Sequence, residues 1–302
     1  MNLSALAAKL PPSFELTLAD IGSAGGVHKR WRPIRSHVAA VLFDPLDQTA
    51  ASGRDRYFPV AVAGSKGRAT IHVTNRASMT SALLPNAELL KRFWDKSEHT
   101  EIVKSFEAAT DALDNIVAEN AIALDVLKID VQGGEYDILT GARAALKSIF
   151  LAEIETSFIE RYSGLRTFDA VVSLMHGEGF DLIDVSRLKR YRYRNSYGVV
   201  NPGLGFGDRA GRLAFCDTVF LKRDETLIAR MTAGGEPAVL KIVLALLVYG
   251  KADMAAALFD QGAGRASSEL RALFARYFRS VSGKGFRPQG LHRALDYLAR
   301  KV

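Results

Sequence analysis

Cysteine is almost absent from this sequence: Cys216 is the only one in 302 residues. A single cysteine excludes an internal disulfide framework and fits a reducing compartment. Cys216 lies in the apolar pattern LAFCDTVFL, which is typical of a strand. We therefore interpret its thiol as a small buried hydrophobic group and not as a nucleophile.

A long hydrophobic run is also missing. The longest run, residues 238–249, contains Lys241 and is shorter than the ~20 residues that span a bilayer. Near the N-terminus, Lys9, Pro11 and Pro12 interrupt the apolar pattern, which departs from the layout of a signal peptide. We expect no transmembrane segment, a cytoplasmic location, and a short docking helix within residues 1–13.

The six histidines lack the spacing of metal ligands, and the chain has neither internal repeats nor low-complexity tracts. Apolar residues make up 48% and charged residues 24% of the chain, which excludes a disordered protein and predicts one sizeable core with an appendage. The net charge of +7 is uneven: residues 1–221 contain 26 basic and 26 acidic residues, and residues 222–302 contain 14 and 7.

Beyond residue 224 the apolar pattern becomes helical only. We therefore predict a main domain over residues 14–224 and a basic helical extension over residues 225–302. The extension would form a homo-oligomer surface or a cover over the substrate. Nucleic acid and anionic membranes are less favoured partners, because the charges are spread over the whole segment. The predicted helices of the extension cover residues 240–248, 254–259, 270–278 and 291–298.

The first half of the main domain contains a βαβ pattern. A strand closes on Asp20, a glycine-rich turn follows, and residues 27–38 show helical spacing that Pro33 either kinks or delays. A second strand ends at Asp44 and Pro45. Such a turn suits a nucleotide or a carboxylate, and Asp44 is placed to bind a ribose diol. The spacing DIGSAGG is not GxGxxG, which argues against a dinucleotide; a tight turn without a ligand is the alternative.

The stretch from Asp125 to Ala142, DVLKIDVQGGEYDILTGA, reads as a buried strand, a glycine turn and an amphipathic helix. Asp130 falls at the carboxyl end of this strand. In open α/β sheets ligands bind at that edge, so Asp130 is a site candidate. Lys128 lies within the strand, and we expect it to pair with an acid because an unpaired buried ammonium is costly.

The other segments are less distinctive. Residues 57–75 suggest a hairpin, and residues 76–105 read as a loop over the site. A strand ends at Glu155, and a further strand is followed by the loop RLKRYRYRNSY and by the last strand, LAFCDTVFL. The loop mixes arginine and tyrosine, which suits an anionic glycan, a sugar phosphate or stacked bases; a solvated hairpin is the alternative. The substrate candidates in it are Arg190, Tyr191, Arg192 and Tyr193.

The motifs DIGSAGG, VLFDP, FPVAVAGSKG, LKIDVQGGEYDILTGA and AEIETSF together resemble the FkbM-type family of S-adenosylmethionine-dependent methyltransferases. The resemblance covers roughly residues 14–222. It implies an α/β, Rossmann-like class I methyltransferase sheet of seven strands with an antiparallel last strand. It also implies S-adenosylmethionine as cofactor and O-methylation of a hydroxyl on a sugar, a glycan or a natural product.

The resemblance assigns roles to residues of this chain. Asp44 matches the acidic ribose-binding position, and Lys128, Asp130, Gly133 and Glu135 match the KIDVEGxE block. Gln132 departs from that block, where glutamate is usual, and this puts a role of the position as base or metal ligand in doubt. The first cofactor motif is matched by Asp20, Gly22, Ser23, Ala24, Gly25 and Gly26.

Methyl transfer to a hydroxyl needs alignment of the acceptor and a group that takes or orients its proton. Asp130 is our first candidate, with Glu135 and Glu155 as helpers. Asp130 and Glu155 with a third oxygen ligand also form a candidate Mg²⁺ site, and hydrogen bonding of these acids to loop amides is the alternative. Two other functions stay open: ribose 2′-O-methylation of RNA, and a non-catalytic cofactor-binding partner, which only Gln132 favours.

Overall fold

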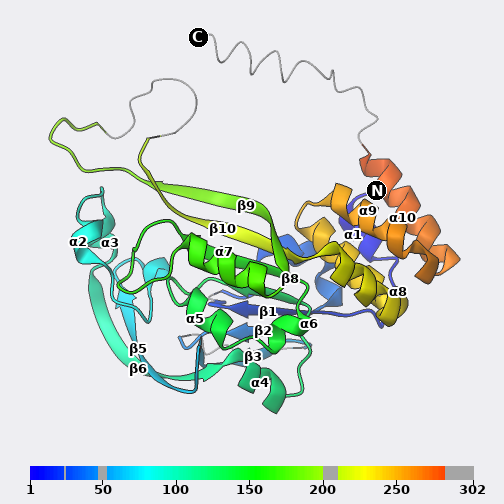
Figure 1. The fold of residues 1–302 in the computed structure, drawn as a ribbon, viewed down its shortest axis with the longest axis horizontal. Coiled ribbons are helices and arrows are strands. Elements are labelled where there is room, and N and C mark those ends of the chain that lie inside the picture. The colour runs from blue at the N-terminus through cyan, green and yellow to red at the C-terminus, as the bar shows by residue number, and fades with distance from the viewer. Residues whose placement is uncertain (24, 47–52, 200–209, 283–302) are drawn as a thin grey trace, which may run out of the picture.

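The computed structural model describes residues 1–23, 25–46, 53–199 and 210–282. Within these residues the chain forms a seven-stranded sheet and a separate three-stranded sheet (Figure 1). In the larger sheet β10 is antiparallel to both neighbours and the other strands are mutually parallel, as predicted. Its strand order is β3 (Arg56–Phe58), β2 (Val38–Phe43), β1 (Leu16–Ile21), β7 (Val126–Ile129), β8 (Leu151–Ser157), β10 (Arg212–Lys222) and β9 (Phe180–Tyr191).

Helices cover both faces of the larger sheet, because its central strands carry apolar side chains on both faces. On one face, Leu127 and Ile154 share a core with four helices: α4 (Leu113–Glu119), α5 (Glu135–Thr140), α6 (Ala145–Ser148) and α7 (Phe168–Gly177). On the other face, Leu18 and Val126 share a core with α1 (Leu3–Ala7), the 3-10 helix η1 (Lys29–His37) and α8 (Asp224–Val248). The helix α1 lies within residues 1–13, for which the sequence predicts a docking helix.

The helix predicted for residues 27–38 is shorter and tighter than its apolar spacing suggests. It is the 3-10 helix η1, which contains Pro33 and has a non-helical residue at Ile34 (φ −124°, ψ 19°). Proline removes a backbone donor and its ring clashes with the preceding turn, so a regular α-helix cannot continue through it. Trp31 and Ile34 still reach the core, and β2 begins directly after η1, at Val38.

The hairpin predicted for residues 57–75 is wrong. In the three-stranded sheet, β6 (Ile102–Ala112) lies between β4 (Ala61–Ala63) and β5 (Gly67–Thr74), so β4 and β5 do not pair with each other. The first half of β6 is mostly exposed and shows no clear apolar alternation, which hides a strand from sequence patterns. The connection from β5 to β6 contains η2 (Ala77–Met79), α2 (Ala87–Leu90) and α3 (Lys96–His99).

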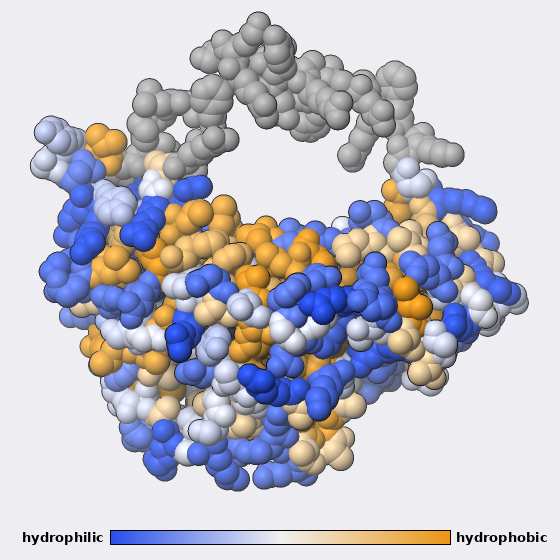
Figure 2. Space-filling view, viewed as in Figure 1, coloured by the Kyte–Doolittle hydropathy of each residue, from blue (hydrophilic) through white to orange (hydrophobic). Residues whose placement is uncertain are grey.

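The edge strand β9 is longer than the sequence pattern indicates and takes in the start of the predicted loop. Its pairing with β10 has irregularities between Phe215 and Asp217 and between Val219 and Phe220. Such bulges bend and twist an edge strand. Apolar side chains gather over this ribbon (Figure 2), and the exposed ones on β9 are Leu182, Val185 and Leu188.

The C-terminal helices are α8, α9 (Ala252–Gly262) and α10 (Ser268–Val281). Among the described helices, α8 alone is long and apolar enough to cross a membrane. It is interrupted at Gly235 (φ 63°), and its second half, residues 239–247, lies in the same core as strands of the large sheet. This burial is typical of a core helix. The predicted helix at residues 291–298 lies outside the described residues.

Candidate functional site

The carboxyl ends of β1, β2 and β7 meet at one point. The Gly22 backbone amide donates to the Phe43 carbonyl (2.9 Å), and the Asp130 amide donates to the Ile21 carbonyl (2.9 Å). Gly22 has φ 81°, and a Cβ atom there would lie 2.0 Å from the Asp130 carbonyl oxygen. Only glycine fits this approach. The predicted cofactor turn and the predicted acid are therefore in direct contact.

The turn after β1 has the features that an adenosyl ligand needs. Gly25 and Gly26 have φ values of 86° and 83°, and a Cβ built on either meets nothing within 4 Å. The buried Ser23 hydroxyl has no hydrogen-bond partner among the described residues. Backbone amides beside open space and a buried hydroxyl that needs a partner are consistent with a bound polar ligand. Ala24, which the resemblance adds to this set, lies outside the described residues.

Asp44 lies beside this turn at the end of β2 and is buried. Its carboxylate accepts a hydrogen bond from the Leu46 amide (2.8 Å), and its backbone carbonyl accepts one from the Tyr57 hydroxyl. Pro45 follows and is partly buried. The predicted ribose-binding carboxylate is thus held at the edge where the glycine turn opens.

Asp20 pairs with Lys128 at 2.9 Å, which confirms the acidic partner predicted for that lysine. Burial raises the pKa of Asp20, and the neighbouring ammonium opposes the rise. Asp20 and Lys128 are register partners on adjacent strands, and each lies one residue before the last residue of its strand. The pair is therefore inside the sheet, behind the edge where a ligand would bind. We therefore interpret Asp20 as a residue that stabilises the end of β1, from which the glycine turn begins.

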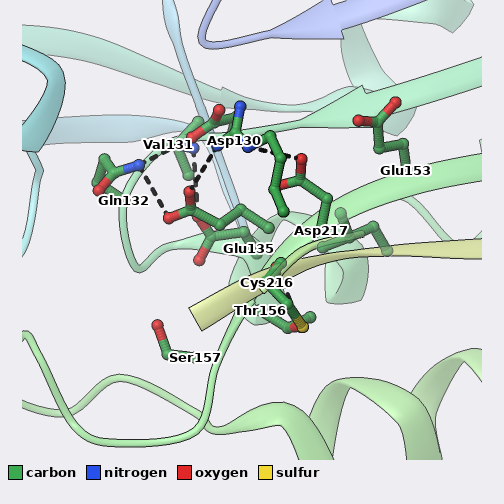
Figure 3. Close-up of polar contacts among 12 residues, drawn as sticks. Asp130, Val131, Gln132, Glu135, Glu153, Thr156, Ser157, Cys216 and Asp217 are labelled. Carbon is green, nitrogen blue, oxygen red and sulfur yellow. Dashed lines mark hydrogen bonds and ion pairs between the residues drawn. The ribbon is translucent and has the colours of Figure 1, made fainter. Parts of the chain in front are cut away.

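Three acids lie side by side at the carboxyl edge of the central strands. Asp217 is the register partner of Glu155, and Asp130 follows Ile129, which pairs with Ile154. The Gln132 amide nitrogen donates to Asp130 Oδ1 (2.8 Å) and to Glu155 Oε1 (2.9 Å) (Figure 3). The sequence candidates Asp130 and Glu155 are thus brought together through Gln132.

Arginines balance these acids. Arg161 is buried and pairs with Glu155 at 2.7 Å. Burial raises the pKa of Glu155, and the Arg161 guanidinium opposes the rise. Arg187 is half exposed, with Nε 2.9 Å from Asp217 and Nη2 3.5 Å from Glu155. Its φ of 49° belongs to the left-handed region, which the irregular pairing of β9 accommodates.

Sequence reasoning missed Asp217, although an acid inside the apolar pattern LAFCDTVFL was a signal. Its burial raises its pKa to about 7, and Arg187 opposes the rise. In the unfolded chain the value is near 3.8, so between these limits the folded form binds more protons. The contribution of Asp217 to stability is therefore full below about pH 4 and is lost as the pH rises through about 7.

We expect Asp217→Asn to flatten the dependence of stability on pH. Urea unfolding between pH 5 and pH 8 should show a shallower decline than in the wild type, with a difference of at most about 1.4 kcal/mol per pH unit. Asp260→Asn, at an exposed site on α9, serves as the control. Coincident slopes for the wild type and Asp217→Asn would contradict this prediction.

Comparison with known proteins identifies the family of this chain. The model of the family described as "Methyltransferase FkbM domain" matches residues 26–182, just over half of the chain. The chain belongs to the FkbM methyltransferase family. The matched segment includes Asp44, Asp130, Glu135 and Glu155, and Asp217 lies beyond it. Membership implies S-adenosylmethionine as the methyl donor.

Two solved structures are similar to this FkbM-family protein. A methyltransferase FkbM from Methylobacillus flagellatus KT is 12% identical with a TM-score of 0.34, over 73% of this chain and 48% of that one. A putative methyltransferase from Thermoplasma acidophilum is 9% identical with a TM-score of 0.29, over 72% and 71%. This chain therefore spans about half the length of the first structure. A search of the curated proteins found no match.

Glu135, a predicted helper of this FkbM-family site, turns toward its own loop. Its carboxylate accepts from the Gly133 amide at 3.0 and 2.9 Å and from the Val131 amide at 3.2 Å. Burial raises its pKa to about 7, and Glu155 adds to the rise. Glu135 thus holds the loop that carries Gln132.

The C-terminal extension also reaches the polar layer behind the site. Glu153 accepts two hydrogen bonds from Arg30 (2.6 and 2.9 Å) and one from the Tyr249 hydroxyl (2.8 Å). Tyr249 directly follows α8. No local sequence pattern predicts such a contact, because the partners are far apart in the sequence. The extension is thus connected to the sheet by polar as well as apolar contacts.

The four substrate candidates lie where the β9–β10 ribbon meets the segment before α3. Tyr191 is buried against Phe93, and Tyr193 is exposed with its ring 4.9 Å from the Phe93 ring. Arg190 donates to the Gly211 carbonyl (3.3 Å), and the Arg192 carbonyl accepts from the Trp94 amide (2.9 Å). Tyr193 therefore presents the most side-chain surface of the four.

The donor set at Asp130 and Glu155 does not fit a Mg²⁺ ion. Residues 1–23, 25–46, 53–199 and 210–282 contain no group of three or more acidic, histidine or cysteine side chains placed to hold a metal. The Gln132 amide nitrogen donates to both carboxylates from the position between them. A hard cation needs oxygen ligands there. The alternative to a metal site was hydrogen bonding of the acids to loop amides. The Glu135 carboxylate makes such bonds, with the Val131 and Gly133 amides.

Proposed function

We propose that this protein is an S-adenosylmethionine-dependent O-methyltransferase that acts on a hydroxyl of a sugar, a glycan or a natural product. The observation that carries the proposal is the contact between the Asp130 backbone and Gly22 in the turn after β1. It sets one carboxylate at the boundary between the cofactor turn and the open edge of the sheet, where an acceptor hydroxyl would approach.

The residues divide into two groups in this proposal. Asp44 and the turn from Gly22 to Gly26 hold the cofactor. When bound, S-adenosylmethionine supplies an electrophilic methyl on a sulfonium. Asp130 orients the acceptor hydroxyl and takes its proton as the new O–C bond forms and the C–S bond breaks. The Gln132 amide fixes the Asp130 carboxylate through the 2.8 Å hydrogen bond.

A second candidate function is ribose 2′-O-methylation of RNA, which the Arg and Tyr side chains of the β9–β10 ribbon favour. Methyl incorporation from labelled cofactor into RNA can be compared with incorporation into nucleotide sugars and glycolipid extracts. Incorporation into RNA alone would replace the glycan proposal. Calorimetry with S-adenosylmethionine tests both: no binding at millimolar cofactor would contradict both enzyme candidates. The third candidate, a non-catalytic cofactor-binding partner, would bind the cofactor without methyl incorporation into any acceptor. We place the enzyme in the cytoplasm, with the helical extension as its oligomer surface.

Asp44→Ala is expected to weaken S-adenosylmethionine binding by about tenfold or more, because hydrogen bonds to a charged group contribute about 1.5–3 kcal/mol. Calorimetry measures the affinity, and circular dichroism checks the fold. Asp137→Ala, at an exposed position on α5, is the matched control. Unchanged affinity in Asp44→Ala would remove this carboxylate from the cofactor site.

A further inference from the structure

The Gln132 side chain lies between two carboxylates and two donors. Its Nε2 atom donates to Asp130 and Glu155 at 2.8 and 2.9 Å. Its Oε1 atom accepts from the Tyr162 hydroxyl at 3.2 Å and from Arg161 at 3.4 Å. Two acceptors on one side and two donors on the other decide which amide atom faces the acids. The –NH₂ group therefore occupies the position between the carboxylates.

The backbone holds this amide in place. Gln132 has φ 63°, a left-handed conformation that residues other than glycine adopt at a cost. Its carbonyl accepts a hydrogen bond from the Ser81 hydroxyl (2.8 Å), and the next amide, that of Gly133, is bound by Glu135. The side chain is thus directed by a loop restrained on both sides. Strain of this kind persists where the surrounding contacts require it.

We propose that the Gln132 amide excludes a divalent cation from this site. It joins Asp130 and Glu155 through two N–H donors, fixes the Asp130 carboxylate, and makes the site independent of metal. Arg161 and Arg187 already neutralise Glu155, at 2.7 and 3.5 Å. The inference rests on the proposed function only for the role of Asp130. Cation binding is measured without methyl transfer, so failure of one proposal is distinguishable from failure of the other.

Gln132→Glu tests the inference, because it replaces the donor with a third carboxylate oxygen between two existing ones. We expect the variant to bind Mn²⁺ at least about tenfold more tightly than the wild type, since three carboxylates form a hard-cation site. Electron paramagnetic resonance of free Mn²⁺ measures the binding. The melting temperature should rise with Mn²⁺ in the variant and stay constant in the wild type.

The matched control exchanges the two groups. Gln132→Glu combined with Glu155→Gln keeps two acids and one amide, and Arg161 lies near both positions. This double variant should bind Mn²⁺ no better than the wild type. Should Gln132→Glu fail to fold, Gln132→Ala opens the same gap, and Mn²⁺ binding by that variant alone supports the proposal. Wild-type Mn²⁺ binding that Asp130→Asn abolishes would overturn it, as would equal binding by all variants.

Discussion

Asp130→Asn is expected to abolish methyl transfer while S-adenosylmethionine affinity stays within a few fold of the wild type. The asparagine keeps the shape of the side chain, and its carbonyl oxygen can still accept the Gln132 hydrogen bond. It cannot take the proton of an acceptor hydroxyl. Loss of a positioned general base lowers a rate by about 10²- to 10⁴-fold. The reduction should appear in kcat and not in the cofactor affinity.

Asp137→Asn provides the matched control, because Asp137 is exposed on α5 at the far side of the same loop. Methyl incorporation is measured with whichever acceptor pool gives turnover in the wild type, and cofactor affinity is measured by calorimetry. Turnover retained by Asp130→Asn would remove Asp130 from the chemistry. A parallel loss of cofactor affinity would instead make Asp130 a binding group for the donor.

The strands and turns of this fold could be predicted where local sequence decides the structure. Buried parallel strands such as β1 and β7 are short apolar runs, and glycines that need positive φ end them. For that reason both residues of the Gly22–Asp130 contact belong to motifs that the sequence predicts. The strand β6 could not be found, because its outer half is exposed and its partners come from the segments before it.

The site was predictable only in part, because some of its contacts depend on the packing of distant segments and not on local sequence. Asp44 and Asp130 directly follow β2 and β7, Glu155 lies two residues before the end of β8, and the sheet brings these acids to one edge. Asp217 lies beside Glu155 through strand register, and Tyr249 contacts Glu153 behind the site through helix packing; no local pattern specifies either contact. Glu135 shows the opposite limit: a motif position predicted to assist chemistry binds the amides of its own loop. A sequence motif predicts where a residue lies in the fold, but the direction of its side chain decides which groups it binds.

Gly22→Ala is expected to destabilise the fold and to abolish cofactor binding. A methyl group on Gly22 would lie 2.0 Å from the Asp130 carbonyl oxygen, so the turn after β1 or the end of β7 must move. The φ of 81° adds the cost of a left-handed alanine, about 1 kcal/mol. We expect a total loss of roughly 3 kcal/mol, in the range of buried steric conflicts.

Gly25→Ala separates the two causes. Gly25 has nearly the same φ, 86°, but a Cβ there meets nothing within 4 Å. Only the backbone cost of about 1 kcal/mol should appear, measured by urea unfolding without cofactor. Equal destabilisation by the two variants would show that the close approach to Asp130 contributes nothing. A larger loss in Gly22→Ala would mean that one backbone contact positions both the turn after β1 and Asp130, which follows β7.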